Sequence, residues 1–386
     1  ATCGCASAAS GACRSRWREA GLAEAFKNLI HRELVARVAA RLHQAGPGFD
    51  RKRFTELAAV GLEALELKAR AMQLADALEA TLPDDFARAG ALLQAAMEGD
   101  EGLEGWALWP VGEYVARRGL HEPARALALL HRLTQRFSAE FAIRPFIVHH
   151  PALVFETLAR WTTDPSEHVR RLVSEGSRPR LPWGLQLKSL VADPSPTLPL
   201  LAALQDDESE YVRRSVANHL NDIAKDHPAL VADWLERHLP GASPQRRRLL
   251  RHASRTLVKR GDARVLAAWG LGRPLQGSAA LALKPARVAL GGRVQLAATL
   301  ASRSAKPQPL AVDYVVHHVK ADGSTSPKVF KGWQLVLAPK ASVTLEKRHP
   351  LKPITTRRYH AGRHRVTLQV NGAAVAEAAF TLALPK

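Results

Sequence analysis

The fold is decided by the stretch DPSEHVRRLVSE, residues 164–175, which returns as DESEYVRRSVAN at residues 207–218. Asp, Ser, Glu, Val, Arg-Arg and Val recur at the same positions, at an offset of 43 residues. Repeats of about 40–47 residues are typical of helix pairs that bury their apolar faces only by stacking on neighbouring pairs. The repeated phrase therefore predicts a mainly α chain, an α-α superhelix of HEAT-like repeats.

Each copy of the phrase separates an apolar helix face from a polar one. In the second copy an apolar stripe at helical spacing runs through Val212, Val216, Leu220 and Ile223. A polar stripe, roughly 200° around the helix, carries Arg214, Asn218 and Asp222. We expect the Arg-Arg pair on the face that does not pack, where successive repeats would offer a basic surface to a long anion. The alternative is an ordinary solvated helix face, which is what most charge runs are.

The composition favours the basic surface. The chain has 386 residues, with 55 Lys and Arg against 36 Asp and Glu, a net charge of +19 and a pI near 10.4. Such an excess of positive charge points to nucleic acid or to an anionic membrane surface. No apolar run approaches the ~18 residues that span a bilayer, so we expect nucleic acid and not a membrane as the partner.

The first residues read as separate from the fold. All three cysteines, Cys3, Cys5 and Cys13, lie there, which fits a reducing cytosol better than a disulfide-linked secreted domain. Cys-x-Cys without a second pair or a nearby His is a weak metal motif. We expect a disordered extension over residues 1–20, a cytoplasmic protein, and neither a metal nor a cofactor.

Two domains are expected beyond this extension. Helical periodicity fills residues 21–272, including segments 24–44, 51–80 and 139–147. After residue 277 the pattern changes to alternation, and residues 365–370 run into Asn371-Gly372, the strongest short hairpin signal. Roughly seven short strands over residues 278–386 predict a small all-β immunoglobulin-like sandwich.

Three segments carry a resemblance to a known family. They are FSAEFAIRPF (137–146), EHVRRLVSEGSRPRLPW (167–183) and YVRRSVANHLNDIAKDHP (211–228). They resemble the signature segments of AlkC-type DNA glycosylases, HEAT-like-repeat enzymes of bacterial alkylation repair, and the resemblance spans about residues 21–272. One branch of that family carries a C-terminal immunoglobulin-like domain. The resemblance implies excision of N3-methyladenine and related cationic alkylated bases from double-stranded DNA, without flipping the lesion into a pocket.

The resemblance implies three catalytic carboxylates, Glu140, Glu175 and Asp222. A base alkylated at a ring nitrogen is cationic and leaves readily, so the chemistry needs carboxylates that stabilise an oxocarbenium-like sugar and position water. Glu175 precedes Gly176, a candidate helix C-cap, and Glu140 is expected at a helix start, where an acid is favourable anyway. The alternative role for all three is an ion pair with a neighbouring Arg or Lys at helical spacing.

The same segments supply candidate DNA contacts. Trp183 stands in a loop-like Pro-Trp-Gly context and by resemblance faces the DNA; a core position is its alternative. The other expected DNA contacts within the matching segments are Arg144, Arg171, Arg178, Arg214, Asn218 and Lys225. A denser basic stripe that we expect along the duplex backbone includes Arg247, Arg248 and Arg251.

A second class of function stays open at this point. The chain contains no phosphate-binding loop, His-Glu-x-x-His or Gly-x-Ser-x-Gly motif. The rival interpretation is a non-enzymatic HEAT-repeat scaffold or nucleic-acid-binding adaptor, which would need the arginines but not the three carboxylates. We expect a monomer with no obligate protein partner.

Overall fold

The computed structural model describes residues 26–271, 273–353 and 358–384. The extension expected at residues 1–20 and the three cysteines therefore lie outside the described residues. By their contacts the residues form two compact units, one running to Leu190 and including Ser195–Leu200, the other comprising Val191–Pro194 and Leu201 onward. Among the described residues, no helix is long and apolar enough to cross a membrane.

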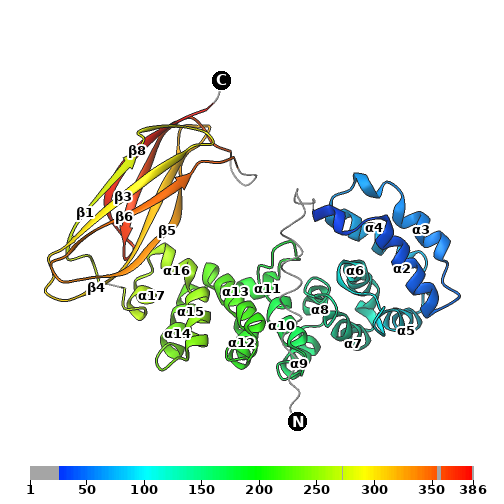
Figure 1. Cartoon of the computed structure of the whole chain (residues 1–386). Helices are drawn as coiled ribbons and strands as arrows, with labels where there is room; N and C mark the ends of the chain where they lie inside the picture. Colours follow the sequence, from blue (N-terminus) through cyan, green and yellow to red (C-terminus); the bar gives the residue numbers. More distant parts are fainter. Residues whose placement is uncertain (1–25, 272, 354–357, 385–386) are drawn as a thin grey trace, which may run out of the picture. The chain divides into compact units, whose positions relative to one another are not determined.

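The first unit consists of helices. They are η1 (Phe26–Leu29), α2 (Arg32–Ala45), α3 (Arg51–Ala59), η2 (Leu62–Ala64), α4 (Leu67–Glu79), α5 (Phe86–Met97), η3 (Gly105–Ala107), α6 (Leu108–Arg118), η4 (Gly119–His121), α7 (Pro123–Thr134), α8 (Arg144–His149), α9 (Pro151–Trp161) and α10 (Glu167–Gly176). Figure 1 shows α6 and α8 in one row and α7 and α9 in another. The single helix expected over residues 51–80 is wrong, because Gly61 adopts a left-handed φ of 64° and separates α3 from α4.

The helices continue into the second unit. The unit boundary falls within α11 (Lys188–Ala192) and α12 (Leu198–Leu204), with η5 (Ser195–Thr197) between them. The remaining helices are α13 (Glu210–Asp226), α14 (Pro228–His238), α15 (Pro244–Ala253), α16 (Arg255–Arg260) and α17 (Ala263–Ala268). Of these, α13 packs against α14, α15 and α16.

Both copies of the repeated phrase begin a helix in the same way. The backbone N–H of Ser166 donates to Asp164 Oδ1 at 2.8 Å before α10, and that of Ser209 donates to Asp207 Oδ1 at 2.8 Å before α13. Each Asp thereby satisfies a backbone donor that the entering turn would leave unpaired. The apolar stripes are confirmed, since the Val pairs of both copies, at 169 and 173 and at 212 and 216, are fully buried.

The expectation that both arginines of the pair face outward is wrong for the first one. Arg170 is 8% exposed, and its Nη1 donates to the carbonyl oxygens of Asp164 and Pro165 at 2.8 and 3.0 Å. Arg213 donates to the same two positions of its own copy. The first arginine of each pair therefore folds back on the turn that precedes its helix. The environment of the second arginine can then differ between the two copies.

The C-terminal part of the second unit is a two-sheet sandwich. Its strands are β1 (Gly277–Lys284), β2 (Arg287–Ala289), β3 (Arg293–Ser302), β4 (Gln308–Val319), β5 (Thr325–Leu337), β6 (Ser342–Pro350), β7 (Gly362–Val370) and β8 (Ala373–Ala383). One sheet has the order β1-β3-β6 and the other β2-β8-β7-β4-β5, with the β2–β8 pair parallel. Buried apolar side chains of both sheets form the core between them.

The hairpin predicted at Asn371-Gly372 is confirmed. Both residues have positive φ, 50° and 81°, and they join β7 to β8 as a type I′ turn requires. The Asn371 side chain also accepts from Ala311 N and donates to Arg273 O, at 2.8 and 2.7 Å. With helices ending at Ala268 and strands beginning at Gly277, the predicted fold class of stacked helix pairs followed by an all-β sandwich is confirmed.

Candidate active site

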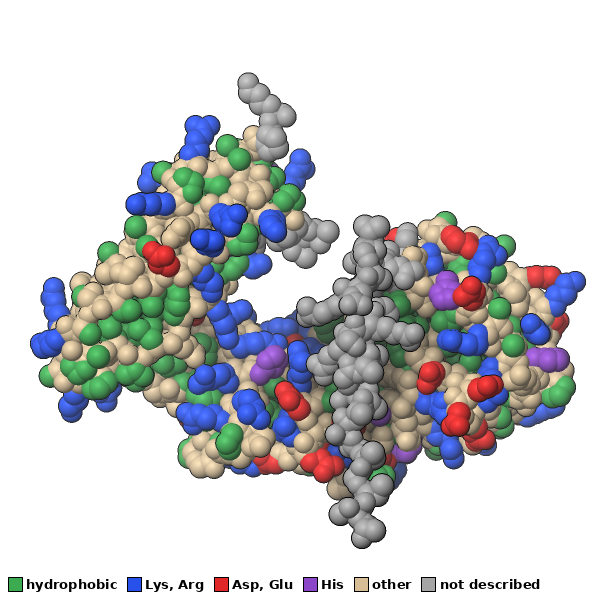
Figure 2. Space-filling model, viewed as in Figure 1, with side chains coloured by type: hydrophobic (Ala, Val, Ile, Leu, Met, Phe, Trp, Pro, Cys, Tyr) green, Lys and Arg blue, Asp and Glu red, His purple; other side chains and the backbone are tan. Residues whose placement is uncertain are grey.

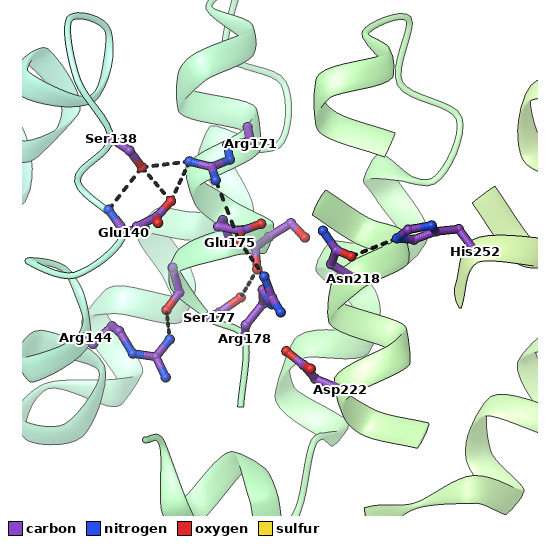
Figure 3. A network of polar contacts seen from close by, with 12 residues as sticks. Ser138, Glu140, Arg144, Arg171, Glu175, Ser177, Arg178, Asn218, Asp222 and His252 are labelled. Carbon is purple, nitrogen blue, oxygen red and sulfur yellow. Dashed lines mark hydrogen bonds and ion pairs between the residues drawn. The ribbon is translucent and has the colours of Figure 1, made fainter. Parts of the chain in front are cut away.

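Two of the three candidate carboxylates share one network in the first unit (Figure 3). Arg171, on α10, lies between them: its Nη1 is 2.6 Å from Glu140 Oε2, and its Nη2 is 3.6 Å from Glu175 Oε1. Arg178 reaches the same Glu175 oxygen at 2.6 Å. We call Glu140, Arg171, Glu175 and Arg178, together with Ser138, the acid–arginine network.

The network is largely withdrawn from solvent. The Glu175 side chain is 8% exposed, and the side chains of Glu140 and Arg171 are 17% and 15% exposed. Buried charges of this kind are tolerated when opposite charges and hydrogen bonds surround them, and removing one partner is costly. The ion-pair role considered as an alternative therefore exists in the structure, and it also holds both carboxylates at fixed positions.

The Glu140 carboxylate is held by a turn and not by a helix start. The expected helix over residues 139–147 begins later, because α8 starts at Arg144. Ser138 Oγ donates to Glu140 Oε2 at 2.8 Å and accepts from the Glu140 backbone N–H at 3.4 Å. Ser138 also accepts from Arg171 at 2.7 Å. Sequence reasoning missed Ser138, although its place two residues before an acid in a short turn is a signal for such a contact.

Gly176 has a different role from the helix cap expected for it. It is the last residue of α10 and does not adopt positive φ. A Cβ on Gly176 would approach Ile143 Cγ2 to 2.6 Å and Leu172 Cδ1 to 3.3 Å. The missing side chain lets the end of α10, and with it Glu175, lie close against the segment that precedes α8.

Arg144 does not face solvent, so the DNA contact expected for it is wrong. The residue is 0% exposed, its Nε donates to Leu185 O at 2.5 Å and its Nη1 donates to Gly176 O at 2.8 Å. A guanidinium this deeply buried and bound to backbone carbonyls has no surface left for a phosphate. Its place is structural, between the end of α10 and the loop that follows it.

Trp183 stands out from that loop. It is 67% exposed, which excludes the core position considered as its alternative, and its φ is +66°. A left-handed backbone in a bulky residue other than glycine costs on the order of 1–2 kcal/mol and tends to be kept at functional sites. Its carbonyl oxygen accepts from Lys68 Nζ on α4 at 3.4 Å. The loop therefore holds a large ring in solvent at an energetic cost.

The third carboxylate, Asp222, lies on α13 in the second unit. Its side chain is 3% exposed, and Oδ1 accepts from Lys225 Nζ at 2.7 Å, so the ion pair at helical spacing also exists here. Lys225 itself is 40% exposed. An Asp inside a helix is a poor helix former, and this one is buried besides. The structure thus keeps a buried anion beside a solvent-facing cation.

One turn earlier on α13, Asn218 is bound from a neighbouring helix. Its Oδ1 accepts from His252 Nε2 on α15 at 2.8 Å and from Arg255 Nη2 at 3.3 Å. Burial, then the positive charges of Arg255, Arg214 and Lys331, lower the pKa of His252 to about 4. The ring is therefore neutral at physiological pH and donates its Nε2 proton. Sequence reasoning missed His252, although it lies four residues after Arg248 on the basic stripe.

The basic stripe on α15 is split between two environments. Arg247 and Arg251 lie over the ring of Trp269, at 5.3 and 5.1 Å from its centroid, and Arg251 also donates to Gln334 Oε1 of β5 at 3.1 Å. Arg248 is exposed and, with the exposed Arg214 of α13, lines a groove of about 260 Å³. Figure 2 shows Lys and Arg side chains gathered over the second unit. Of the arginines named here, Arg214 and Arg248 line this groove, whereas Arg247 and Arg251 lie over Trp269.

Metal ligation finds no support among the described residues. In that part of the chain no group of three or more His, Cys, Asp or Glu side chains is arranged to hold a metal ion. What the described side chains do offer is carboxylates fixed by cations, an exposed strained Trp and exposed arginines.

Two family models match this chain. Residues 137–257 match the model described as DNA alkylation repair enzyme, and these include all three candidate carboxylates. Residues 277–384 match the model described as uncharacterised protein YhaZ, C-terminal Ig-like domain, which corresponds to the sandwich.

Two relatives match over nearly the whole length. The uncharacterized protein YhaZ of Bacillus subtilis (strain 168) is 34% identical over 353 residues, covering 90% of this chain and 96% of that protein. The structure of Pseudomonas fluorescens alkylpurine DNA glycosylase AlkC bound to DNA containing an abasic site analog matches with a TM-score of 0.87 and 36% identity, covering 93% of this chain and 100% of that one. The chain therefore belongs to the AlkC family of DNA alkylation repair enzymes, in the branch that carries a C-terminal immunoglobulin-like domain.

Proposed function

We propose that this chain is a DNA glycosylase that excises cationic alkylated bases, N3-methyladenine and related lesions, from double-stranded DNA. The observation that carries the proposal is the match to a DNA-bound alkylpurine glycosylase at 36% identity over 93% of the chain. Three carboxylates lie within the residues matched to the repair-enzyme model, two of them buried and Glu140 partly buried, and each has a cationic partner.

The chemistry of the lesion explains why carboxylates would suffice. An alkylated ring nitrogen makes the base positively charged, so it departs as a neutral molecule with little acid catalysis. The sugar left behind develops positive charge, which a fixed carboxylate stabilises, and a carboxylate also orients the attacking water. Glu140, Glu175 and Asp222 take these roles in the proposal.

Recognition follows from the remaining side chains. Exposed arginines, first of all Arg214 and Arg248, would bind backbone phosphates of the duplex. Trp183 would contact the DNA near the lesion from outside the helix, in place of an extruded base entering a pocket. The chain acts as a monomer in this proposal, without a metal or cofactor.

The test is incubation of the protein with duplex DNA methylated at adenine N3, followed by chromatography of the released bases. We expect free N3-methyladenine and no release of uracil from a matched uracil-containing duplex, because uracil is neutral and leaves poorly without acid catalysis. Tight DNA binding with no released base would identify a non-enzymatic adaptor. Efficient uracil release would contradict the proposed mechanism.

A further inference from the structure

One side chain, that of Arg144, is hydrogen-bonded to both ends of the loop that carries Trp183. The loop, residues 177–187, joins α10 to α11. Arg144 reaches it from α8: Nη1 binds Gly176 O, immediately before the loop, and Nε binds Leu185 O, near the loop's end. Because the guanidinium is planar and rigid, two bonds from one group fix the two backbone positions relative to each other.

The loop also rests on the stem of the same arginine. A Cβ added to Gly184 would lie 3.4 Å from Arg144 Cδ, 3.3 Å from Phe141 Cδ1 and 3.1 Å from Leu181 Cδ2. Within the loop, the backbone hydrogen bonds from Gly184 N to Leu181 O and from Leu187 N to Pro179 O are both 3.2 Å, at the long end of the usual range. The left-handed backbone of Trp183 is thus held by its surroundings more than by the loop itself.

The two hydrogen bonds of Arg144 connect two parts of the candidate site. Gly176, whose carbonyl Arg144 binds, directly follows Glu175, and Leu185 lies two residues after Trp183. We propose that Arg144 is a positioning residue, which holds the carboxylate of Glu175 and the ring of Trp183 at one fixed spacing. This inference rests on the proposed glycosylase function, because a fixed spacing matters when both side chains meet one stretch of DNA.

The experiment compares Arg144→Lys with a matched control, Arg70→Lys. Arg70 is 3% exposed, and its guanidinium donates to the carbonyl oxygens of Ile30, Glu63 and Leu65, none of which belongs to the loop. Lysine keeps the charge but cannot donate in a fork to two carbonyls. We expect both variants to lose stability, but excision at saturating DNA to slow about thirtyfold in Arg144→Lys and less than about twofold in Arg70→Lys. Equal excision rates per folded molecule in Arg144→Lys and Arg70→Lys would overturn the proposal.

A double-mutant cycle tests whether Arg144 acts through the loop. In a Trp183→Ala background, Arg144→Lys should slow excision by less than about threefold, because coupled residues are not additive. An undiminished thirtyfold effect would overturn the proposal. If Arg144→Lys does not fold, Gly184→Ala is the milder variant: its methyl group displaces the loop from Arg144 and Phe141, so excision should slow about threefold with little change in stability.

Amide hydrogen exchange separates this inference from the proposed function. Arg144→Lys should speed exchange at residues 177–187 at least about tenfold, and Arg70→Lys should leave that segment unchanged. Unchanged exchange in Arg144→Lys would overturn the positioning role whatever the activity. If the wild-type protein releases no methylated base while the two variants still differ in exchange, the glycosylase proposal is overturned and the positioning role of Arg144 stands.

Discussion

Helices α10 and α13 begin with the same phrase and end in different chemistry. Three features are shared: the Asp that accepts from the N–H of the N-cap Ser, the first arginine bound to the preceding turn, and the buried Val pair. The second arginine differs: Arg171 is 15% exposed and bound to two carboxylates, and its counterpart Arg214 is exposed beside a groove. The twelfth position differs too, since Glu175 pairs with arginines and Asn218 accepts from His252.

The comparison separates what the repeat needs from what function adds. Positions that pack or cap must satisfy the same physical conditions in every repeat, so they keep the same residue types. Positions on the other face meet whatever each helix has beside it, so one phrase can build an ion-pair network in one place and a basic surface in another.

The largest effect is expected from the carboxylates. Glu175→Gln and Asp222→Asn keep shape and remove charge, so each should slow excision roughly a hundredfold, equivalent to ~2.7 kcal/mol of transition-state stabilisation. Single-turnover rates on methylated duplex measure the effect. DNA affinity should hold or rise, because an anion near phosphates is lost.

Thermal unfolding of the same two variants is the control. Removing a buried anion leaves Arg178 or Lys225 with one partner fewer, so a moderate loss of stability is expected in both. Lost stability with unchanged activity per folded molecule would show that these carboxylates serve the fold alone.

The second arginines should differ in how much their removal changes the stability of the fold. Arg171→Ala strips a cation from two largely buried carboxylates and should lower the free energy of unfolding by about 2 kcal/mol. Arg214→Ala alters an exposed side chain and should change it by less than about 0.5 kcal/mol. Denaturant unfolding gives both numbers.

The salt dependence of DNA affinity tests whether the exposed arginines bind phosphates. If Arg214 binds a phosphate, Arg214→Ala should flatten the slope of log affinity against log salt by about 0.9. Arg248→Ala should do the same, whereas Arg251→Ala should do so less, because Arg251 is engaged by Trp269 and Gln334. An unchanged slope in both Arg214→Ala and Arg248→Ala would remove this groove from the DNA interface.

The Asp before each helix is expected to stabilise it through its hydrogen bond to the Ser two residues later. Asp207→Ala should cost about 1 kcal/mol, the usual value for one hydrogen bond. Asp164 also lies 2.6 Å from His131 Nε2, so Asp164→Ala should cost about 1.5 kcal/mol. The cost of Asp164→Ala should fall to about 1 kcal/mol when His131 is first replaced by Gln, and an unchanged cost would mean that the His131 contact adds no stability.

Features that depend on neighbours in sequence could be predicted, and features that depend on neighbours in the fold could not. The period, the apolar stripes and the Asn371-Gly372 turn were predictable because each depends on neighbours in sequence. The burial of Arg144 and the left-handed backbone of Trp183 were not, since both depend on carbonyls and side chains that only the fold brings together. The family resemblance predicted that Arg144 contacts DNA, but its side chain is buried and donates to backbone carbonyls.

The smallest expected change is a pKa shift of His252, which donates to the twelfth-position residue Asn218. Folding lowers the pKa of His252 to about 4, below its ordinary 6.5, so the neutral ring contributes stability that is complete above pH 6.5 and is lost as the pH falls toward 4. Burial is the largest cause of this low pKa, and the positive charges of Arg255, Arg214 and Lys331 add to it, so phosphates bound near Arg214 and Arg255 would offset part of the lowering. DNA binding should therefore raise the pKa of His252 by about 1, measured by NMR on its ring protons. His364, in the sandwich, whose pKa burial lowers, should not move, and an unmoved His252 would place the phosphates elsewhere.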